Sequence, residues 1–201
     1  MKNKYFYSLF IILTLTVLMV PLAGAADVDF LYKIENNDGL NNHNLLGIQI
    51  ENRMDSDYLF SASGFTGNLI NDEEDCQQFN INMHKKMNFK SDFDYYLGAG
   101  YNYSFNDSDE LKKNLLFLSL KGINEQDQYS VISKVSYAPL GTYSFTGEDL
   151  ENMSAWDIKL TFKTYIGKNF NLSLTGAMGG ETFQDFSVNK NEYLIGVGWD
   201  L

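Results

Sequence analysis

Residues 93–105 read FDYYLGAGYNYSF, and two kinds of side chain alternate over their whole length. One set of alternate positions is aromatic or aliphatic, while the other set, apart from Tyr96, is polar or small. Successive side chains of a strand point to opposite faces, so a period of two predicts a β-strand whose faces meet different surroundings. On this pattern Leu97 belongs to the apolar face, and Gly98 and Gly100 belong to the other.

Stretches with the same alternation recur from residue 28 to the end of the chain, about ten in all. We predict strands at residues 28–34, 46–51, 58–63, 79–87, 93–105, 115–120, 129–137, 156–166, 170–179 and 192–201. The third and sixth stretches are the least regular, and in the sixth Leu115 and Phe117 place apolar residues on both faces. A barrel of eight strands therefore remains an alternative.

The connections between these stretches are predicted to alternate in length. Long loops are expected at 36–43, 67–77, 106–113, 140–154 and 184–191, and Pro139 is expected to end the seventh strand. Strands of about nine to eleven residues, with short turns at one end and longer loops at the other, are typical of barrels that span a bilayer. The pattern predicts an all-β fold, namely a closed antiparallel up-and-down transmembrane β-barrel of about ten strands.

Alternation alone does not say whether the apolar face points inward, as in a soluble lipocalin-like barrel, or outward to lipid. Aromatic residues gather near the ends of the apolar faces, which favours lipid, because membrane barrels carry aromatic girdles at both interfaces. The predicted girdle residues are Tyr101, Tyr103, Phe105, Trp156, Tyr193 and Trp199. The polar face would then line the lumen with a network of paired charges: Asp29, Lys33, Glu51, His84, Lys86, Asp94, Lys134, Asp157, Lys159, Lys163, Glu192 and Asp200.

The beginning of the chain has the pattern of a secretory signal peptide. Lys2 and Lys4 precede a largely apolar run at 9–22, and Ala23-Gly24-Ala25 matches a cleavage site of small residues. An uncleaved transmembrane anchor is the alternative, which the shortness of the apolar run disfavours. We predict a signal peptide at residues 1–25 and one barrel domain at 26–201.

Composition narrows the possible partners. The chain has 26 acidic and 15 basic residues, a formal charge of −11, and loss of Lys2 and Lys4 would make the exported chain more acidic still. An acidic exported protein is a poor candidate for nucleic-acid binding. Cys76 is the only cysteine, which excludes an internal disulfide and a cysteine-based metal site. We predict no cofactor.

Few residues suit catalysis or metal binding. The two histidines, His43 in the first long loop and His84 on the polar face, are accompanied by no D-x-H, G-x-S-x-G or H-E-x-x-H motif. We therefore predict no catalytic site and no enzyme activity. Acidic residues cluster at 71–75 and 106–110, but neither cluster has the spacing of a calcium-binding loop. A solvated surface is the favoured interpretation, and no metal site is predicted.

The last residues, LIGVGWDL, resemble the C-terminal assembly signal of bacterial outer-membrane proteins through Gly196 and Trp199. Leu194 stands where that signal usually has a polar residue, and Leu201 where it usually has an aromatic one. The chain from residue 26 onward resembles in architecture the small outer-membrane barrels of the OmpA-domain, OmpX and Opa type, or those of the YfaZ family. The resemblance implies a bacterial outer-membrane location, contact with membrane lipids, insertion by the outer-membrane assembly machinery, and both termini in the periplasm. A monomer is expected.

The size of the predicted barrel limits what it can do. Ten strands about 4.8 Å apart enclose a backbone radius of roughly 10 Å, which inward side chains largely fill. We expect a structural or surface-interaction protein of the outer membrane. A narrow porin-like channel for small solutes is the second hypothesis, and a soluble periplasmic barrel that binds an apolar ligand is the third.

Overall fold

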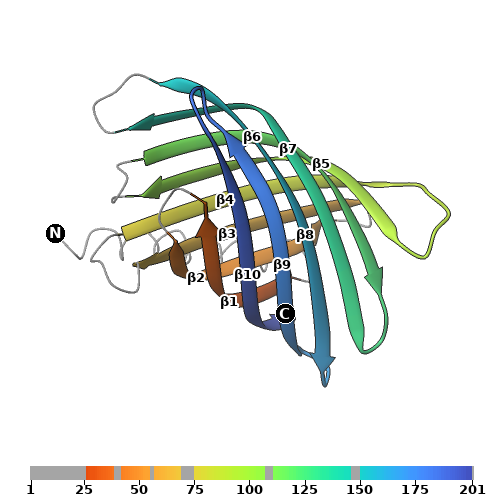
Figure 1. Cartoon of the computed structure of the whole chain (residues 1–201). Helices are drawn as coiled ribbons and strands as arrows, with labels where there is room; N and C mark the ends of the chain where they lie inside the picture. The colour runs from red at the N-terminus through yellow and green to blue at the C-terminus, as the bar shows by residue number, and fades with distance from the viewer. Residues whose placement is uncertain are drawn as a thin grey trace.

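The computed structural model is a single closed barrel, and it describes residues 26–38, 42–54, 57–68, 75–106, 111–145 and 150–200 (Figure 1). Its strands in the described residues are β1 (Ala26–Asn37), β2 (His43–Met54), β3 (Tyr58–Asn68), β4 (Asp75–Met87), β5 (Asp94–Asn106), β6 (Leu111–Glu125), β7 (Tyr129–Phe145), β8 (Glu151–Ile166), β9 (Phe170–Thr182) and β10 (Ser187–Asp200). The predicted all-β barrel of ten strands is confirmed, and the eight-stranded alternative is wrong.

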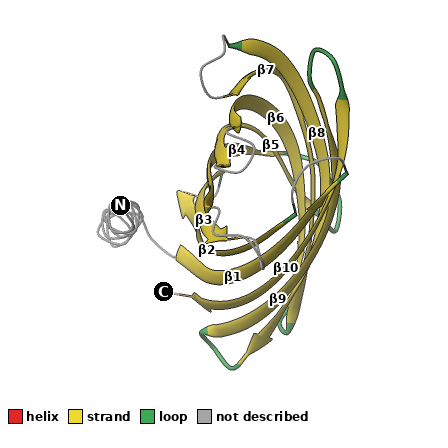
Figure 2. Ribbon diagram, turned by 60° about the vertical axis from the view of Figure 1, so that its left-hand side comes forward, coloured by secondary structure: helices red, strands yellow, loops and turns green. Residues whose placement is uncertain are grey.

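Every strand is hydrogen-bonded, antiparallel, to the strands that precede and follow it, and β1 closes the ring against β10. Figure 2 shows the strands curving around a common interior. In the closing pair Asp27 lies opposite Asp200, so β1 begins and β10 ends at the same end of the barrel. We call this end the terminal end and the opposite end the far end.

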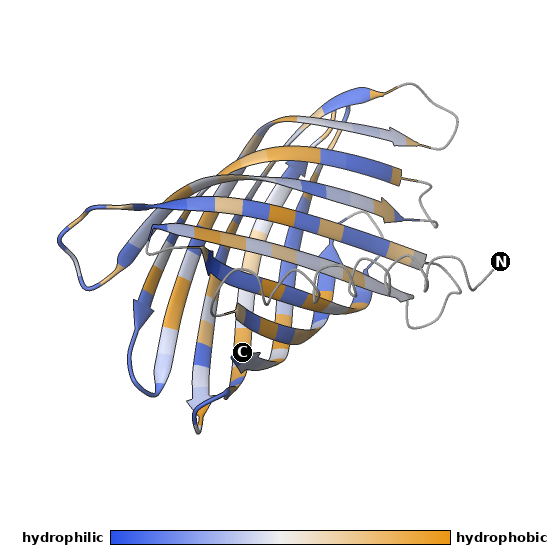
Figure 3. Ribbon diagram, turned by 180° about the vertical axis from the view of Figure 1, so that it is seen from behind, coloured by the Kyte–Doolittle hydropathy of each residue, from blue (hydrophilic) through white to orange (hydrophobic). Residues whose placement is uncertain are grey.

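The two faces of the strands have opposite polarity. Large apolar side chains point outward and stay exposed, with exposed fractions of 57% for Phe30 and 59% for Leu160, whereas the inward Lys33 and His84 are only 4% and 2% exposed. Figure 3 shows the resulting alternation of hydropathy along the strands. A soluble protein has the reverse arrangement, and an apolar outer band around a polar interior is that of a barrel in a bilayer. The hypothesis of a soluble barrel with an apolar ligand site is therefore wrong.

The irregular pattern of the sixth predicted strand has a structural cause in β6. Leu116, Leu118 and Leu120 point outward, as expected, but Leu115 and Phe117 point inward and are buried. They belong to an apolar cluster inside the barrel, so both faces of β6 are apolar in this stretch. Period-two alternation fails wherever part of the interior is apolar.

The strands extend further than the sequence indicates, and the predicted loops 140–154 and 184–191 are wrong. Strand β7 runs through Pro139, because its pairing with β6 and β8 shifts by one residue around this position. Such a bulge leaves a backbone group unpaired and therefore accommodates a residue without an N–H. Strand β10 begins at Ser187, so connection 183–186 is shorter than connection 88–93 at the terminal end. The predicted alternation of long and short connections therefore does not hold along the whole chain.

Gly98 and Gly100 face inward, and the packing requires both to be glycine. A Cβ atom at Gly98 would lie 2.5 Å from Cδ2 of His84 and would also clash with the carbonyl of Met83. A Cβ atom at Gly100 would lie 2.6 Å from Cζ of Phe117. The glycines of β5 therefore make room for side chains from the neighbouring strands.

Several predicted features lie outside the described residues: the signal peptide at 1–25, most of the acidic clusters at 71–75 and 106–110, and Leu201. Within the described ranges, no helix is long and apolar enough to cross a membrane.

The direction of the apolar face can be tested on β9, where Leu174 faces outward between Ile195 and Phe162 while the next residue, Thr175, lines the lumen. We expect Leu174→Lys to reduce the unfolding free energy in bilayers by about 2–4 kcal/mol, because it exposes a charge to lipid. Thr175→Lys, the matched control, should cost less. Leu97 suits this test less well, because Lys85 lies directly opposite it. Urea titrations in lipid vesicles would measure both, and a larger loss for Thr175→Lys would contradict the assignment of faces.

Candidate functional site in the lumen

The lumen contains a cavity of about 230 Å³, to which all ten strands contribute side chains. A space of this size holds several water molecules or one small solute. The formal charges of its wall balance, with six lysines and six carboxylates. These are Lys33, Lys121, Lys134, Lys159, Lys163 and Lys190, and Asp27, Asp29, Glu51, Asp157, Glu181 and Glu192.

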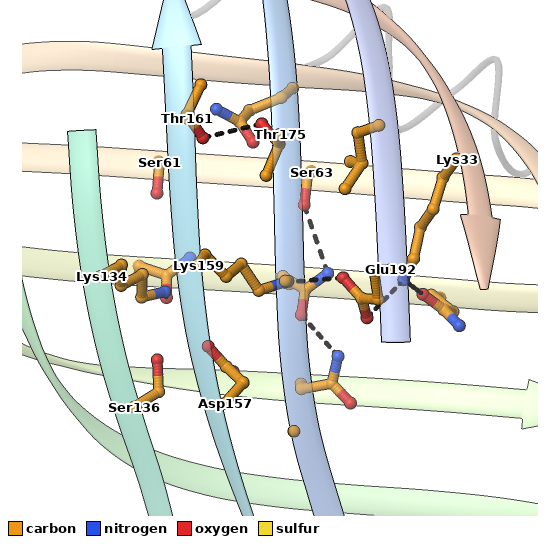
Figure 4. Close-up of a pocket in the computed structure, with 18 of the residues that line it drawn as sticks. Lys33, Ser61, Ser63, Lys134, Ser136, Asp157, Lys159, Thr161, Thr175 and Glu192 are labelled. Atoms are coloured by element: carbon orange, nitrogen blue, oxygen red, sulfur yellow. Dashed lines mark hydrogen bonds and ion pairs between the residues drawn. The ribbon is translucent and has the colours of Figure 1, made fainter. Parts of the chain in front are cut away.

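Glu192 lies at the centre of the largest group of charges in the cavity wall (Figure 4). Its carboxylate is 2.8 Å from Nζ of Lys190, 2.9 Å from that of Lys33 and 3.0 Å from that of Lys159. Glu35 joins the group at 2.6 Å from Lys33 and 3.3 Å from Lys190. This group, which we call the Glu192 cluster, connects β1, β8 and β10.

Other polar contacts cross the lumen between strands that are not neighbours in the ring. The amide of Gln78 on β4 accepts a hydrogen bond from Lys33 at 2.7 Å and donates one to Glu35 at 2.9 Å, both on β1. Lys121 on β6 pairs with Glu51 on β2 at 2.5 Å. These contacts link strands that are three and four places apart in the ring, so the side chains reach across part of the lumen.

Two further ion pairs extend the network towards the two ends. Lys113 on β6 lies 2.8 Å from Glu181 on β9, in the half nearer the far end. Lys163 on β8 lies 3.3 Å from Asp27 and 3.4 Å from Asp29, near the start of β1. Buried charges need partners of this kind, since a buried charge whose partner is removed is strongly destabilising.

Two charges of the cavity wall differ from the rest. Lys134 donates a hydrogen bond to Oδ1 of Asn82 at 3.0 Å, and its Nζ lies 4.8 Å from the ring centroid of Phe117. Oδ1 of Asp157 is buried and has no hydrogen-bond partner among the described residues. Among the described residues, neither Lys134 nor Asp157 has an oppositely charged group within 4.0 Å, the distance limit for a salt bridge.

Apolar side chains flank this polar layer inside the barrel. At the terminal end, Leu59, Tyr96 and Ile123 form a buried cluster. Two clusters lie towards the far end, one of Leu31, Leu45, Phe65, Cys76 and Leu194, the other of Leu111, Leu115, Phe117, Ala138, Tyr143, Met153, Phe183 and Val188. The lumen is therefore a polar layer between apolar layers.

Not every residue predicted for the lumen network lies in the cavity. Lys86 and Asp94 pair with each other at 2.7 Å at the rim of the terminal end, where their side chains are 30% and 49% exposed. Asp200 also lies at this end and accepts a hydrogen bond from Asn171 at 3.2 Å. The remaining predicted network residues, Asp29, Lys33, Glu51, His84, Lys134, Asp157, Lys159, Lys163 and Glu192, all line the cavity.

Sequence reasoning missed several members of the network: Asp27, Glu35, Lys113, Lys121, Glu181 and Lys190. Glu35 follows Lys33 by two positions and Lys190 precedes Glu192 by two. Side chains two positions apart share a face of a strand, so extending each predicted strand by two residues would have placed Glu35 and Lys190 in the lumen. The sequence pattern places Lys113 and Lys190 in loops because the predicted strands begin at 115 and 192, whereas β6 begins at Leu111 and β10 at Ser187.

The predicted girdle residues lie on the outer face at different heights. Trp199 lies near the terminal end, where it packs edge-on against Phe170 at 5.5 Å between ring centroids. Tyr101, Trp156 and Tyr193 are exposed, while Tyr103 and Phe105 are half-buried. Tyr193 lies in the middle of β10, away from either end. Of the C-terminal assembly signal, Gly196 faces the lumen and Trp199 faces outward.

The two histidines and Cys76 are all buried. His84 Nε2 lies 2.8 Å from Oγ of Ser119, and His43, the first residue of β2 rather than a loop residue, lies 3.3 Å from the amide nitrogen of Asn106. Cys76 faces the interior from β4 instead of lying in an acidic loop. The described residues contain no group of three or more His, Cys, Asp or Glu that could hold a metal ion. The absence of enzyme activity stays a prediction.

No protein-family model matches this sequence, and no curated protein sequence matches it significantly. Solved structures match in fold. The outer-membrane protease OmpT from Escherichia coli is 10% identical with a TM-score of 0.58, and the match covers 88% of this chain and 95% of that chain. An outer-membrane channel from Pseudomonas putida F1 is 6% identical with a TM-score of 0.55, covering 89% and 96%.

The N-terminal β-barrel domain of Pseudomonas aeruginosa OprF is 12% identical, covering 89% of this chain and 98% of that chain, with a TM-score of 0.40. Identities this low show a common fold and leave activity open, since unrelated functions share one fold. A protease and a channel both match this chain with TM-scores above 0.5. The chain has the fold of a bacterial outer-membrane β-barrel.

Proposed function

We propose that this protein is a barrel of the bacterial outer membrane whose lumen is closed to solutes and whose role is structural or one of surface interaction. The observation that carries the proposal is the set of polar contacts between strands that are not neighbours in the ring, namely those of Gln78 with Lys33 and Glu35 and that of Lys121 with Glu51. The apolar outer face and the fold shared with solved outer-membrane barrels support the location.

The polar and apolar layers of the lumen would together keep solutes from passing through the barrel. A solute that enters from the terminal end passes the cluster of Leu59, Tyr96 and Ile123 and then meets the polar layer. There it would have to separate buried ion pairs such as Lys121 with Glu51. Leaving a buried charge without its partner costs about 3–5 kcal/mol. Beyond this layer, the apolar clusters around Phe117 and Phe65 would reject hydrated solutes.

The orientation and assembly state belong to the same proposal. We assign the terminal end to the periplasm, where the assembly machinery would recognise the last strand through Gly196 and Trp199. A signal peptide at residues 1–25 would direct export. A closed ring leaves no free strand edge for pairing with another chain, so we expect a monomer. Lipid would contact the outward apolar side chains.

A narrow channel for small solutes is the second candidate, and the cavity favours it. The cavity reaches Asp27, the second residue of β1, whose side chain is 36% exposed at the terminal end. Water and small ions can therefore enter the polar layer from this side.

Planar-bilayer recordings would separate the two candidates. We expect the wild-type barrel to give no stable conductance, because side chains fill the axis. The double variant Lys33→Ser with Gln78→Ser removes the connection between β1 and β4 and shortens two inward side chains, so it should conduct. Arg53→Ser is the control, because Arg53 pairs with Glu125 at the exposed rim, 2.5 Å apart. A stable wild-type conductance of nanosiemens size would contradict the closed lumen.

The Glu192 cluster should also dominate the stability of the lumen. Glu192→Gln leaves the charges of three surrounding lysines poorly compensated, and we expect it to lower the unfolding free energy by about 3–5 kcal/mol. Glu125→Gln is the matched control, since the pair of Glu125 with Arg53 is exposed and worth about 0–1 kcal/mol. Urea titration followed by heat-modifiable gel mobility measures both. Equal losses for the two variants would show that the cluster does not stabilise the barrel.

A further inference from the structure

The charges of the cavity wall pair almost completely, and the exceptions are one lysine and one carboxylate. Of the six lysines and six carboxylates, only Lys134 and Asp157 lack a salt bridge within 4.0 Å among the described residues. They have opposite charges, and they lie on the adjacent strands β7 and β8. A lysine and a carboxylate on adjacent strands would normally form a salt bridge with each other, so the separation of Lys134 and Asp157 requires an explanation.

The strand register places these two groups around a common part of the cavity. Ser136 lies directly opposite Asp157, and Lys134 precedes Ser136 by one inward step, so Lys134 and Asp157 are diagonal neighbours. Diagonal residues of a sheet are about 7–8 Å apart at Cα. Figure 4 shows Lys134, Ser136 and Asp157 together on one side of the cavity, apart from the contact between Lys159 and Glu192.

Unused hydrogen-bonding atoms surround the same space. Ser136 is 3% exposed and lines the cavity, yet its Oγ has no hydrogen-bond partner among the described residues, and the same holds for Oδ1 of Asp157 and Nδ1 of His84. Nζ of Lys134 donates to Asn82 and has two further N–H groups. Buried polar groups are normally satisfied, so this group of side chains is suited to a polar ligand.

We propose that Lys134, Ser136 and Asp157 form a binding site for a small zwitterionic solute of amino-acid type. The ligand carboxylate would accept hydrogen bonds from Lys134 and Ser136, and the ligand ammonium group would donate to Asp157. A simple anion or cation would satisfy only one of the two charges. A zwitterion satisfies both and adds no net charge to a wall whose charges already balance.

The site is within reach of a solute from one end of the barrel. The cavity that contains Lys134 and Asp157 also includes Asp27 at the terminal end, so a ligand can arrive without passing the apolar clusters towards the far end. The volume of the whole cavity, about 230 Å³, is large enough for a small amino acid. Binding is therefore compatible with a closed lumen and does not depend on the proposed structural role.

Equilibrium dialysis of the purified full-length barrel in detergent tests the site, with isotopically labelled glycine as the probe. We expect saturable binding of glycine, with competition by unlabelled glycine but only weak competition by acetate or methylammonium at the same ionic strength. Lys134→Gln and Asp157→Asn should each weaken glycine binding roughly ten- to hundredfold, because each removes one charge-assisted contact. Lys86→Gln, at the exposed rim outside the cavity, is the matched control and should leave binding unchanged.

The outcomes discriminate between this site and simpler alternatives. Heat-modifiable gel mobility establishes that each variant is folded before its affinity is compared. Absence of saturable glycine binding would refute the site, and so would equal competition by acetate, which would indicate a simple anion site at Lys134. Unchanged affinity in folded Lys134→Gln or Asp157→Asn would place the ligand elsewhere. A wild-type barrel that binds glycine but carries no current would support the site and the closed lumen together.

Discussion

The closed ring of hydrogen bonds between strands is the constraint on which the rest of this structure depends. Inside a bilayer an unpaired backbone N–H or C=O group costs several kcal/mol, so a sheet can cross lipid only when its first and last strands pair. Here β1 and β10 pair from Asp27 opposite Asp200 to Asn37 opposite Lys190. Closure gives every strand one face towards lipid and one towards a narrow interior, and the alternation of apolar and polar residues follows from it.

The narrow interior then determines what the polar residues do. Side chains from opposite walls of a ten-stranded barrel are close enough to touch, as Lys121 and Glu51 do. Buried ion pairs contribute little net stability, because desolvation offsets most of their attraction. Their position matters more, because they link strands that are not neighbours in the ring. Lys134 and Asp157 are the charges of the cavity wall that form no salt bridge among the described residues.

The same fold carries a protease in one similar structure and a channel in another. Barrel architecture therefore says little about activity, and differences in function have to be sought in the side chains of the inner wall. In this chain that wall combines a balanced polar layer with apolar clusters towards both ends.

The amino-acid sequence by itself determined the fold class and the two faces of most strands, because period-two alternation is a local property that each strand carries independently. The structure decided between ten strands and eight, and it showed that the apolar face points outward. The sequence also placed most of the network residues on one face, including Lys33, Lys159 and Glu192. Local patterns could not reveal that Pro139 lies in a bulge inside β7, since a bulge depends on the pairing with neighbouring strands. Only the tertiary structure decided which charges pair, because Lys33 and Gln78 are 45 residues apart and meet only when the ring closes. For the same reason the sequence could not show that Lys134 and Asp157 stay unpaired: that depends on how the closed ring distributes every other charge across the lumen.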